Sequence, residues 1–146
     1  MSLDVNMDGK RLELRRYFDA PRERVFDWFT SGEKLQQWAS CKDATECRVT
    51  MDFCVGGSFT HTMVIPCAGG EFTATSQYEE IVVPEKIVYT TNLGFCTATI
   101  SIQFFDEGPG TRLVMTYDGL PEEGFGAAIS QGTGESFDKL DVLLSK

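Results

Sequence analysis

Polar and apolar residues alternate along two stretches in the second half of the chain. Between residues 96 and 105, one side of the pattern is formed by Cys96, Ala98, Ile100, Ile102 and Phe104. Residues 111–118 repeat the pattern with Leu113, Met115 and Tyr117. A period of two is typical of a β-strand that buries one face and exposes the other. The segment DEGPG at 106–110 predicts a turn that joins the two strands as an antiparallel hairpin.

Five more segments have the character of strands. They are residues 11–18, a segment that begins at Glu46 and ends before Gly56, and residues 58–65, 71–83 and 86–93. The alternation within 71–83 loses phase at Glu79 and Glu80, which predicts a β-bulge there. The connections after residue 46 are short, and short connections favour antiparallel pairing. We therefore expect a seven-stranded, mainly antiparallel sheet.

Helical spacing is found in three other places. Pro21 opens a helix with apolar residues at 25, 26 and 29, and a short second helix is expected at 33–38. A long helix is expected from Pro121 to Ser145, with a length of about 37 Å. The resulting fold class is α+β, a curved antiparallel sheet wrapped around a long C-terminal helix, with two short helices after the first strand. We expect residues 1–9 to be a flexible tail and residues 10–146 to be one domain.

Composition narrows the function classes. The net charge of −9 disfavours nucleic acid and anionic membrane surfaces as partners. There is no apolar run of the length of a membrane span and no basic stretch followed by an apolar one, so we expect a cytoplasmic protein. The five cysteines match no zinc spacing and are interpreted as thiols without a disulfide or a metal. Because no glycine-rich phosphate loop precedes a helix, no cofactor is predicted.

Six motifs, in order, resemble a known family. They are RYFDAPRERVF at 16–26, LQQW at 35–38, GGSF at 56–59, YEEIVVPEKIVYT at 78–90, GTRL at 110–113 and ESFDKL at 135–140. The set resembles the START-like (SRPBCC) superfamily, in the branch of homologues of the heat-shock protein 90 ATPase activator. The resemblance implies a helix-grip fold with an interior cavity. The chain departs from the branch at Ala39 and Thr133, where a tryptophan is frequent, and we expect this to change the shape of the cavity.

Strand parity and helix spacing predict which side chains face that cavity. The expected lining is Phe59, His61, Met63, Phe72, Tyr78, Tyr89, Ile100, Ile102, Met115, Tyr117, Phe125, Ile129 and Ser136. Four glycines in the last helix, at 124, 126, 132 and 134, require a close approach, a ligand or a lid, because each is unfavourable in a helix by about 1 kcal/mol. Access to the cavity is expected near residues 125–129.

Few of these residues are of a type that could take part in catalysis. His61 is the only histidine and is interpreted as a polar contact to a ligand or as a core histidine rather than as a catalytic base. Ser136 has no partners for a nucleophilic triad, so no catalytic residue is predicted. The leading hypothesis is binding of a small, mainly apolar molecule in the cavity. Two alternatives that the resemblance implies stay open: an interaction protein that modulates a chaperone ATPase, and a cyclase or dehydratase acting inside the cavity.

Overall fold

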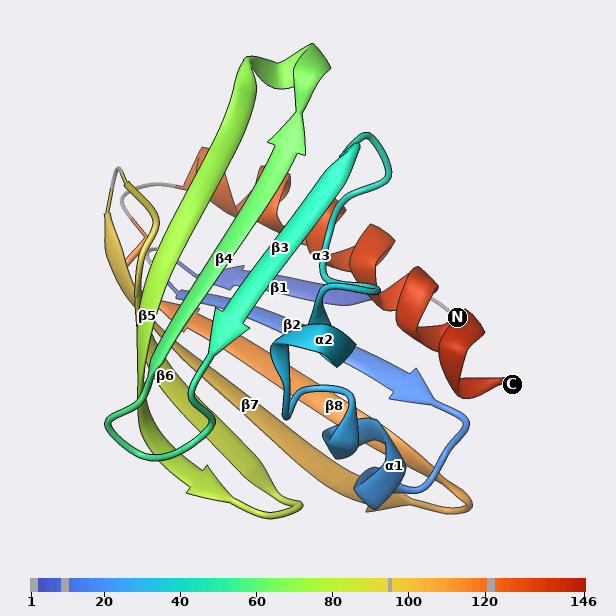
Figure 1. Ribbon diagram of the computed structural model, residues 1–146. Helices are drawn as coiled ribbons and strands as arrows, with labels where there is room; N and C mark the ends of the chain where they lie inside the picture. Colours follow the sequence, from blue (N-terminus) through green and yellow to red (C-terminus); the bar gives the residue numbers. More distant parts are fainter. Residues whose placement is uncertain (1–2, 9–10, 95, 121–122) are drawn as a thin grey trace.

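The computed structural model describes residues 3–8, 11–94, 96–120 and 123–146, and the side chains of all of these except 123–125. Figure 1 shows an antiparallel sheet that curves around one long helix. The strands are β1 (Asp4–Asp8), β2 (Arg11–Phe18), β3 (Glu46–Met51), β4 (Ser58–Ile65), β5 (Gly70–Val82), β6 (Lys86–Asn92), β7 (Thr97–Glu107) and β8 (Gly110–Asp118). The helices are α1 (Arg22–Asp27), α2 (Gly32–Leu35), the 3₁₀ turn η1 (Pro66–Ala68) and α3 (Glu123–Leu144).

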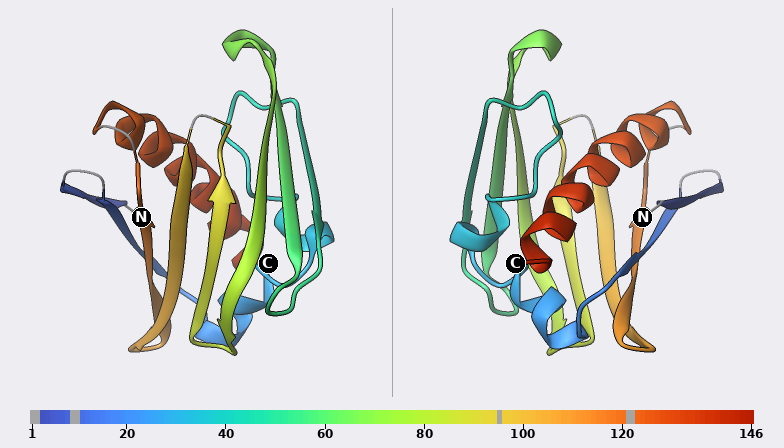
Figure 2. Two further views of the ribbon diagram at one scale, coloured as in Figure 1. Left: turned by 90° about the vertical axis from the view of Figure 1, so that its left-hand side faces the viewer. Right: turned by 90° about the vertical axis from the view of Figure 1, so that its right-hand side faces the viewer.

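The sheet has the strand order β1-β2-β8-β7-β6-β5-β4-β3, and every neighbouring pair is antiparallel. The long helix α3 runs diagonally across the concave side of the sheet (Figure 2). This is the α+β helix-grip arrangement that the sequence predicted. No helix in the part of the chain described by the structure is both long and apolar enough to cross a membrane.

The predicted number of strands was wrong by one. Residues 4–8, expected in a flexible tail, form β1 and pair with β2, with Asp4 opposite Arg15 and Asp8 opposite Arg11. Only Met7 of this strand is partly buried, so its sequence lacks the apolar alternation that marks the other strands. Met7 packs against α3, where a Cβ added at Gly126 would lie 2.7 Å from its sulfur. Close approach to β1 therefore accounts for one of the helix glycines.

The predicted bulge in β5 is confirmed. The register between β5 and β6 shifts between Tyr78 and Glu80. Before the shift Tyr78 pairs with Tyr89, and after it Ile81 pairs with Ile87. The extra residue restores the phase of the alternation, so that apolar side chains on both sides of the bulge point to the concave face. Without the bulge, Tyr78 and Ile81 would point to opposite faces of β5.

The core is concentrated under the C-terminal half of α3. Phe137 meets Phe18 edge to face at a centroid distance of 5.5 Å, and lies 6.0 Å from Trp38. Leu140 and Leu144 on the same helix are buried. In Figure 1 the short helices α1 and α2 lie beside this half of α3 and close that end of the sheet. The helix is therefore firmly packed from Phe137 onward.

Candidate functional site: a cavity between the sheet and the long helix

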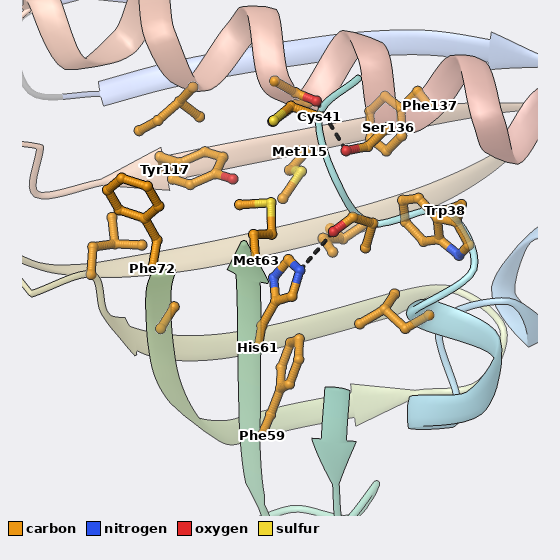
Figure 3. Close-up of a pocket in the computed structure, with 18 of the residues that line it drawn as sticks. Trp38, Cys41, Phe59, His61, Met63, Phe72, Met115, Tyr117, Ser136 and Phe137 are labelled. Carbon is orange, nitrogen blue, oxygen red and sulfur yellow. Dashed lines mark hydrogen bonds between the residues drawn. The ribbon is translucent and has the colours of Figure 1, made fainter. Parts of the chain in front are cut away.

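A cavity of about 470 Å³ lies between the concave face of the sheet and α3. Figure 3 shows its walls: strands β4 and β5 contribute one side, β8 the opposite side, and α3 with the segment after α2 the roof. Almost all the side chains that line it are apolar. A space of this size falls within the range of small-molecule sites, roughly 300–1,000 Å³.

Eleven of the thirteen residues expected in the lining meet there. They are Phe59, His61, Met63, Phe72, Tyr78, Tyr89, Ile102, Met115, Tyr117, Ile129 and Ser136. The side chain of Phe125 lies outside the described residues. Strand parity succeeds for the sheet residues because each of these strands buries one face, and a period of two then fixes which residues point inward.

Ile100 is the exception that the structure contradicts. It lies on the expected face and is only 3% exposed, yet it belongs to the packed core rather than to the cavity wall. Its neighbours in register are Tyr89 on β6 and Tyr117 on β8, which both line the cavity. The two phenol rings are longer than the isoleucine side chain and reach the space above it.

Fifteen further residues line the cavity that were not among the thirteen expected, although the resemblance to the family had implied that Ala39 and Thr133 affect its shape. They are Phe29, Leu35, Trp38, Ala39, Cys41, Ile65, Ala68, Thr73, Ala74, Ile87, Leu93, Ala128, Gly132, Thr133 and Phe137. Parity with Met63 and Tyr89 would have added Ile65 and Ile87, and helix spacing from Ile129 would have added Thr133. The segment 38–41 gave no periodic signal, because a loop that crosses over a cavity has no period, and Ala39 was marked only by the resemblance to the family.

Small side chains on α3 leave the space empty. The helix presents Ala128, Gly132, Thr133 and Ser136 to the cavity. A Cβ added at Gly132 would come near only one atom, the Cβ of Cys41 at 3.9 Å, so the position faces open space. One turn later Phe137 is 1% exposed and fills the interface. The cavity therefore exists where α3 changes from large to small side chains toward its N-terminus.

The burial of the lining residues shows where the cavity opens. Trp38, Phe59 and Phe137 line the deep end and are buried. Phe72 is 45% exposed, and Ala128 on the first half of α3 is also exposed. Figure 1 shows the hairpin of β4 and β5 extending past α3 at this end. The mouth therefore lies between the tip of this hairpin and the first half of α3, which includes part of the region 125–129 where access was expected.

His61 is the main polar side chain of the deep cavity. Its Nε2 lies 2.6 Å from the backbone carbonyl oxygen of Ala39, the contact drawn in Figure 3. Its ring stacks on Phe59 at a centroid distance of 6.2 Å. Burial lowers the pKa of His61 below its usual value of 6.5, and the hydrogen bond to Ala39 only partly offsets this effect. The imidazole is therefore neutral at physiological pH.

The segment after α2 holds the Ala39 carbonyl in place. The indole Nε1 of Trp38 donates a hydrogen bond to the carbonyl of Trp28 at 3.1 Å, and its ring packs on Phe29 at 4.8 Å. The Cys47 thiol also donates to the Ala39 carbonyl, at 3.5 Å. Burial raises the pKa of the Cys47 thiol, which favours its protonated form, and its sulfur lies 3.5 Å from Nε2 of His61.

The tyrosines in the cavity are phenols that stay protonated. The hydroxyl of Tyr78 donates to the sulfur of Met51 at 3.4 Å. Burial raises the pKa of Tyr78 and Tyr89, and it raises that of Tyr117 to about 12 despite the opposing effect of a hydrogen bond with Thr133.

The chemical groups available in the cavity are few. Among the described lining residues, none carries a charge, and no carboxylate or second base faces His61. Within the same part of the chain, His, Cys, Asp and Glu side chains do not gather in a group that could hold a metal ion. What remains is an apolar space with one imidazole and a few hydroxyl groups.

Comparison with solved structures places the fold among bacterial proteins. A structure from Chromobacterium violaceum superposes with a TM-score of 0.85 at 23% identity, covering 94% of this chain and 98% of that one. One from Rhodobacter sphaeroides gives 0.82 at 22% identity, covering 99% and 98%. An uncharacterized protein from Rhizobium leguminosarum gives 0.77 at 25% identity, covering 99% of both chains.

The family comparison agrees with this fold. A search of curated proteins found no match. The family model described as "Activator of Hsp90 ATPase homolog 1-like protein" matches residues 19–145, which is most of the chain. The chain therefore belongs to the family of activator of Hsp90 ATPase homolog 1-like proteins.

Proposed function

We propose that this protein binds one small, mainly apolar molecule in the cavity between the sheet and α3. The observation that carries the proposal is the cavity itself, about 470 Å³ of space with apolar walls inside a core that is otherwise packed. Protein interiors are normally packed like organic crystals, with few voids larger than a water molecule. A space of this size is therefore a feature that the side chains maintain.

The helix that forms the roof supports this interpretation. An apolar void lowers stability, because the atoms around it lack packing partners. Gly132 lowers it further, since glycine is less favourable than alanine in a helix by about 1 kcal/mol. A larger residue at position 132 would improve the helix and fill the space. The glycine is consistent with a site that must stay open for a ligand.

The test uses an uncharged dye that fluoresces in apolar surroundings, N-phenyl-1-naphthylamine. Wild-type protein is expected to bind it saturably, with one dye per chain and a blue-shifted emission. The variant Gly132→Leu places a branched side chain in the open space and is expected to abolish binding while the protein stays folded. Circular dichroism and thermal unfolding check the fold.

Gly134→Leu is the matched control. It makes the same substitution on the same helix, and Gly134 is not part of the cavity wall. A Cβ added there would meet only the Cδ2 of Leu3, at an ordinary contact distance of 3.5 Å. This variant should bind the dye like the wild type. Equal binding by Gly132→Leu, or failure of the wild type to bind, would refute the proposal.

The family gives one alternative. Its description names an activator of the Hsp90 ATPase, which supports a role in modulating a chaperone ATPase. This function would use the outer surface of the protein, so Gly132→Leu should leave it intact. Stimulation of the ATPase by wild type and Gly132→Leu alike, without dye binding by either, would favour the alternative. The cyclase or dehydratase hypothesis has no specific observation in its support.

A further inference from the structure

The hydrogen bond of His61 fixes the position of its proton. A backbone carbonyl can only accept hydrogen bonds, so the 2.6 Å contact with Ala39 requires a proton on Nε2. Because the buried imidazole is neutral, it carries only this proton. Nδ1 therefore has a free lone pair and is a hydrogen-bond acceptor.

This acceptor faces the cavity. His61 is one of the lining residues, and Figure 3 shows its second ring nitrogen pointing away from Ala39, toward the interior of the cavity. Phe59 and Met63 lie on the same face of β4, and Ala74 lies opposite His61 in register on β5. The Cys47 thiol on β3 lies 3.5 Å from Nε2, the ring nitrogen that also meets Ala39. In the described part of the chain, Nδ1 has no hydrogen-bond donor.

Two hydroxyl groups of the cavity direct their protons to the protein. Tyr78 donates to Met51, and Ser136 donates to the carbonyl of Gly132 at 2.9 Å, one turn back on its own helix. The Ser136 oxygen keeps its lone pairs, so it adds acceptor capacity to the roof of the cavity. Nδ1 of His61 and Oγ of Ser136 therefore both offer acceptor capacity to a ligand in the cavity.

The described lining residues also carry no positive charge. Lys139 is the lysine of α3, and it is not part of the cavity wall. Its Nζ donates to Ser40 Oγ at 2.8 Å and to the Cys41 carbonyl at 3.2 Å. A carboxylate placed in the cavity would lose its hydration, with no cation among the described lining residues to replace it. It would also face the lone pair of His61.

We propose that the ligand is an uncharged molecule with a hydroxyl or N–H group that donates a hydrogen bond to Nδ1 of His61. This inference rests on the proposed function, because it names the chemical class of the molecule in the same cavity. The apolar body of the ligand lies against the aromatic walls, and its donor reaches the deep end beside Phe59. The site thereby favours alcohols and phenols over fatty acids and other anions.

Three probes with the same ring system test the inference by calorimetric titration of the wild-type protein. They are 2-naphthol, which has a donor, 2-methoxynaphthalene, which lacks one, and 2-naphthoate, which is charged. A neutral hydrogen bond contributes modestly, so 2-naphthol is expected to bind about three- to tenfold more tightly than the methyl ether. The naphthoate is expected to bind weakest, because its charge is not compensated.

Two variants test whether His61 is the acceptor. His61→Gln can keep a donor toward Ala39 and an acceptor toward the cavity, so it should retain a preference for 2-naphthol. His61→Phe keeps a flat ring but has no acceptor, so it should bind the naphthol and its methyl ether equally. Thermal unfolding shows whether the variants fold, and the comparison of the three probes on the wild type does not depend on them.

The outcomes separate the inference from the proposed function. Equal affinity of the wild type for 2-naphthol and its methyl ether would overturn the inference but leave the apolar cavity as a binding site. Tightest binding of the naphthoate would overturn it as well. No binding of any probe, together with no binding of the dye, would reject the proposed function itself.

Discussion

Arg16 on β2 and Asp138 on α3 form an ion pair that joins the sheet to the helix. The arginine Nη2 lies 2.9 Å from the aspartate Oδ1, and Asp141 one turn away lies 3.7 Å from the same nitrogen. The arginine side chain is 2% exposed and that of Asp138 is 68% exposed. The guanidinium also lies 5.5 Å from the ring centroid of Phe18. The pair is thus strongly asymmetric, with a buried cation and an accessible anion.

This asymmetry predicts that the two partners respond differently to mutation. The double variant Asp138→Asn/Asp141→Asn leaves a buried guanidinium without a counter-ion, which should lower the free energy of unfolding by about 3–5 kcal/mol. Arg16→Met leaves only accessible carboxylates and keeps an apolar side chain in place, so its effect should be about 1 kcal/mol or less. Denaturation in urea measures both. A larger loss for Arg16→Met would contradict this account.

Two helix glycines should respond differently to substitution by alanine. Gly132→Ala is expected to raise the free energy of unfolding by about 0.5–1 kcal/mol, because the new methyl group meets no close atom. Gly126→Ala is expected to gain less or to lose stability, because its Cβ would lie 2.7 Å from the Met7 sulfur and that side chain must move. Thermal unfolding compares them. Destabilisation by Gly132→Ala would mean that the space beside it is filled.

Stability should depend on pH through His61. Its pKa is lowered in the folded protein, so below about pH 6.5 the unfolded chain binds a proton that the folded chain resists. The contribution of His61 is therefore present above that pH and lost as the pH falls toward the folded pKa. Wild type should lose more stability than His61→Gln between about pH 7.5 and about pH 5.5. Parallel losses in the two proteins would show that other groups cause the change.

Stability should also fall at high pH through Tyr117. Burial raises its pKa to about 12, above the ordinary value of 10. Its contribution to stability is therefore complete below about pH 10 and is lost as the pH rises toward the folded pKa. Tyr117→Phe cannot ionise and should lose less stability than the wild type between about pH 9 and about pH 11. Unfolding in urea at both pH values is the measurement, and an equal loss in the two proteins would contradict the prediction.

The cavity residues that lie on the sheet could be found from the sequence, because one physical rule places all of them. Each strand buries a single face, so a period of two places Phe59, His61 and Met63 side by side, and a visible loss of phase at Glu79 marks the bulge. Ile100 shows the limit of this reasoning. Parity gives the face on which a side chain lies, but the size of its neighbours decides whether it reaches the cavity.

Two other features had no signal in the sequence. The strand β1 is held by backbone hydrogen bonds to β2 and by Met7, and backbone pairing does not depend on a pattern of side chains. The Ala39 carbonyl that orients His61 belongs to a loop 22 residues away. A main-chain acceptor is present at every residue, so only the folded structure can show which one a histidine meets.

The small residues that α3 presents to the cavity lie one turn apart, at Ala128, Gly132 and Ser136. They form a row on one face of a helix whose C-terminal half is held to the sheet by the packing of Phe137 and by the ion pair with Arg16. Substitutions at these three positions change the depth and width of the cavity, and they leave the hydrogen bonds between the strands in place because none of the three lies in the sheet. On the proposed function, these three positions on one helix would therefore set which molecules fit the cavity while the sheet stays the same.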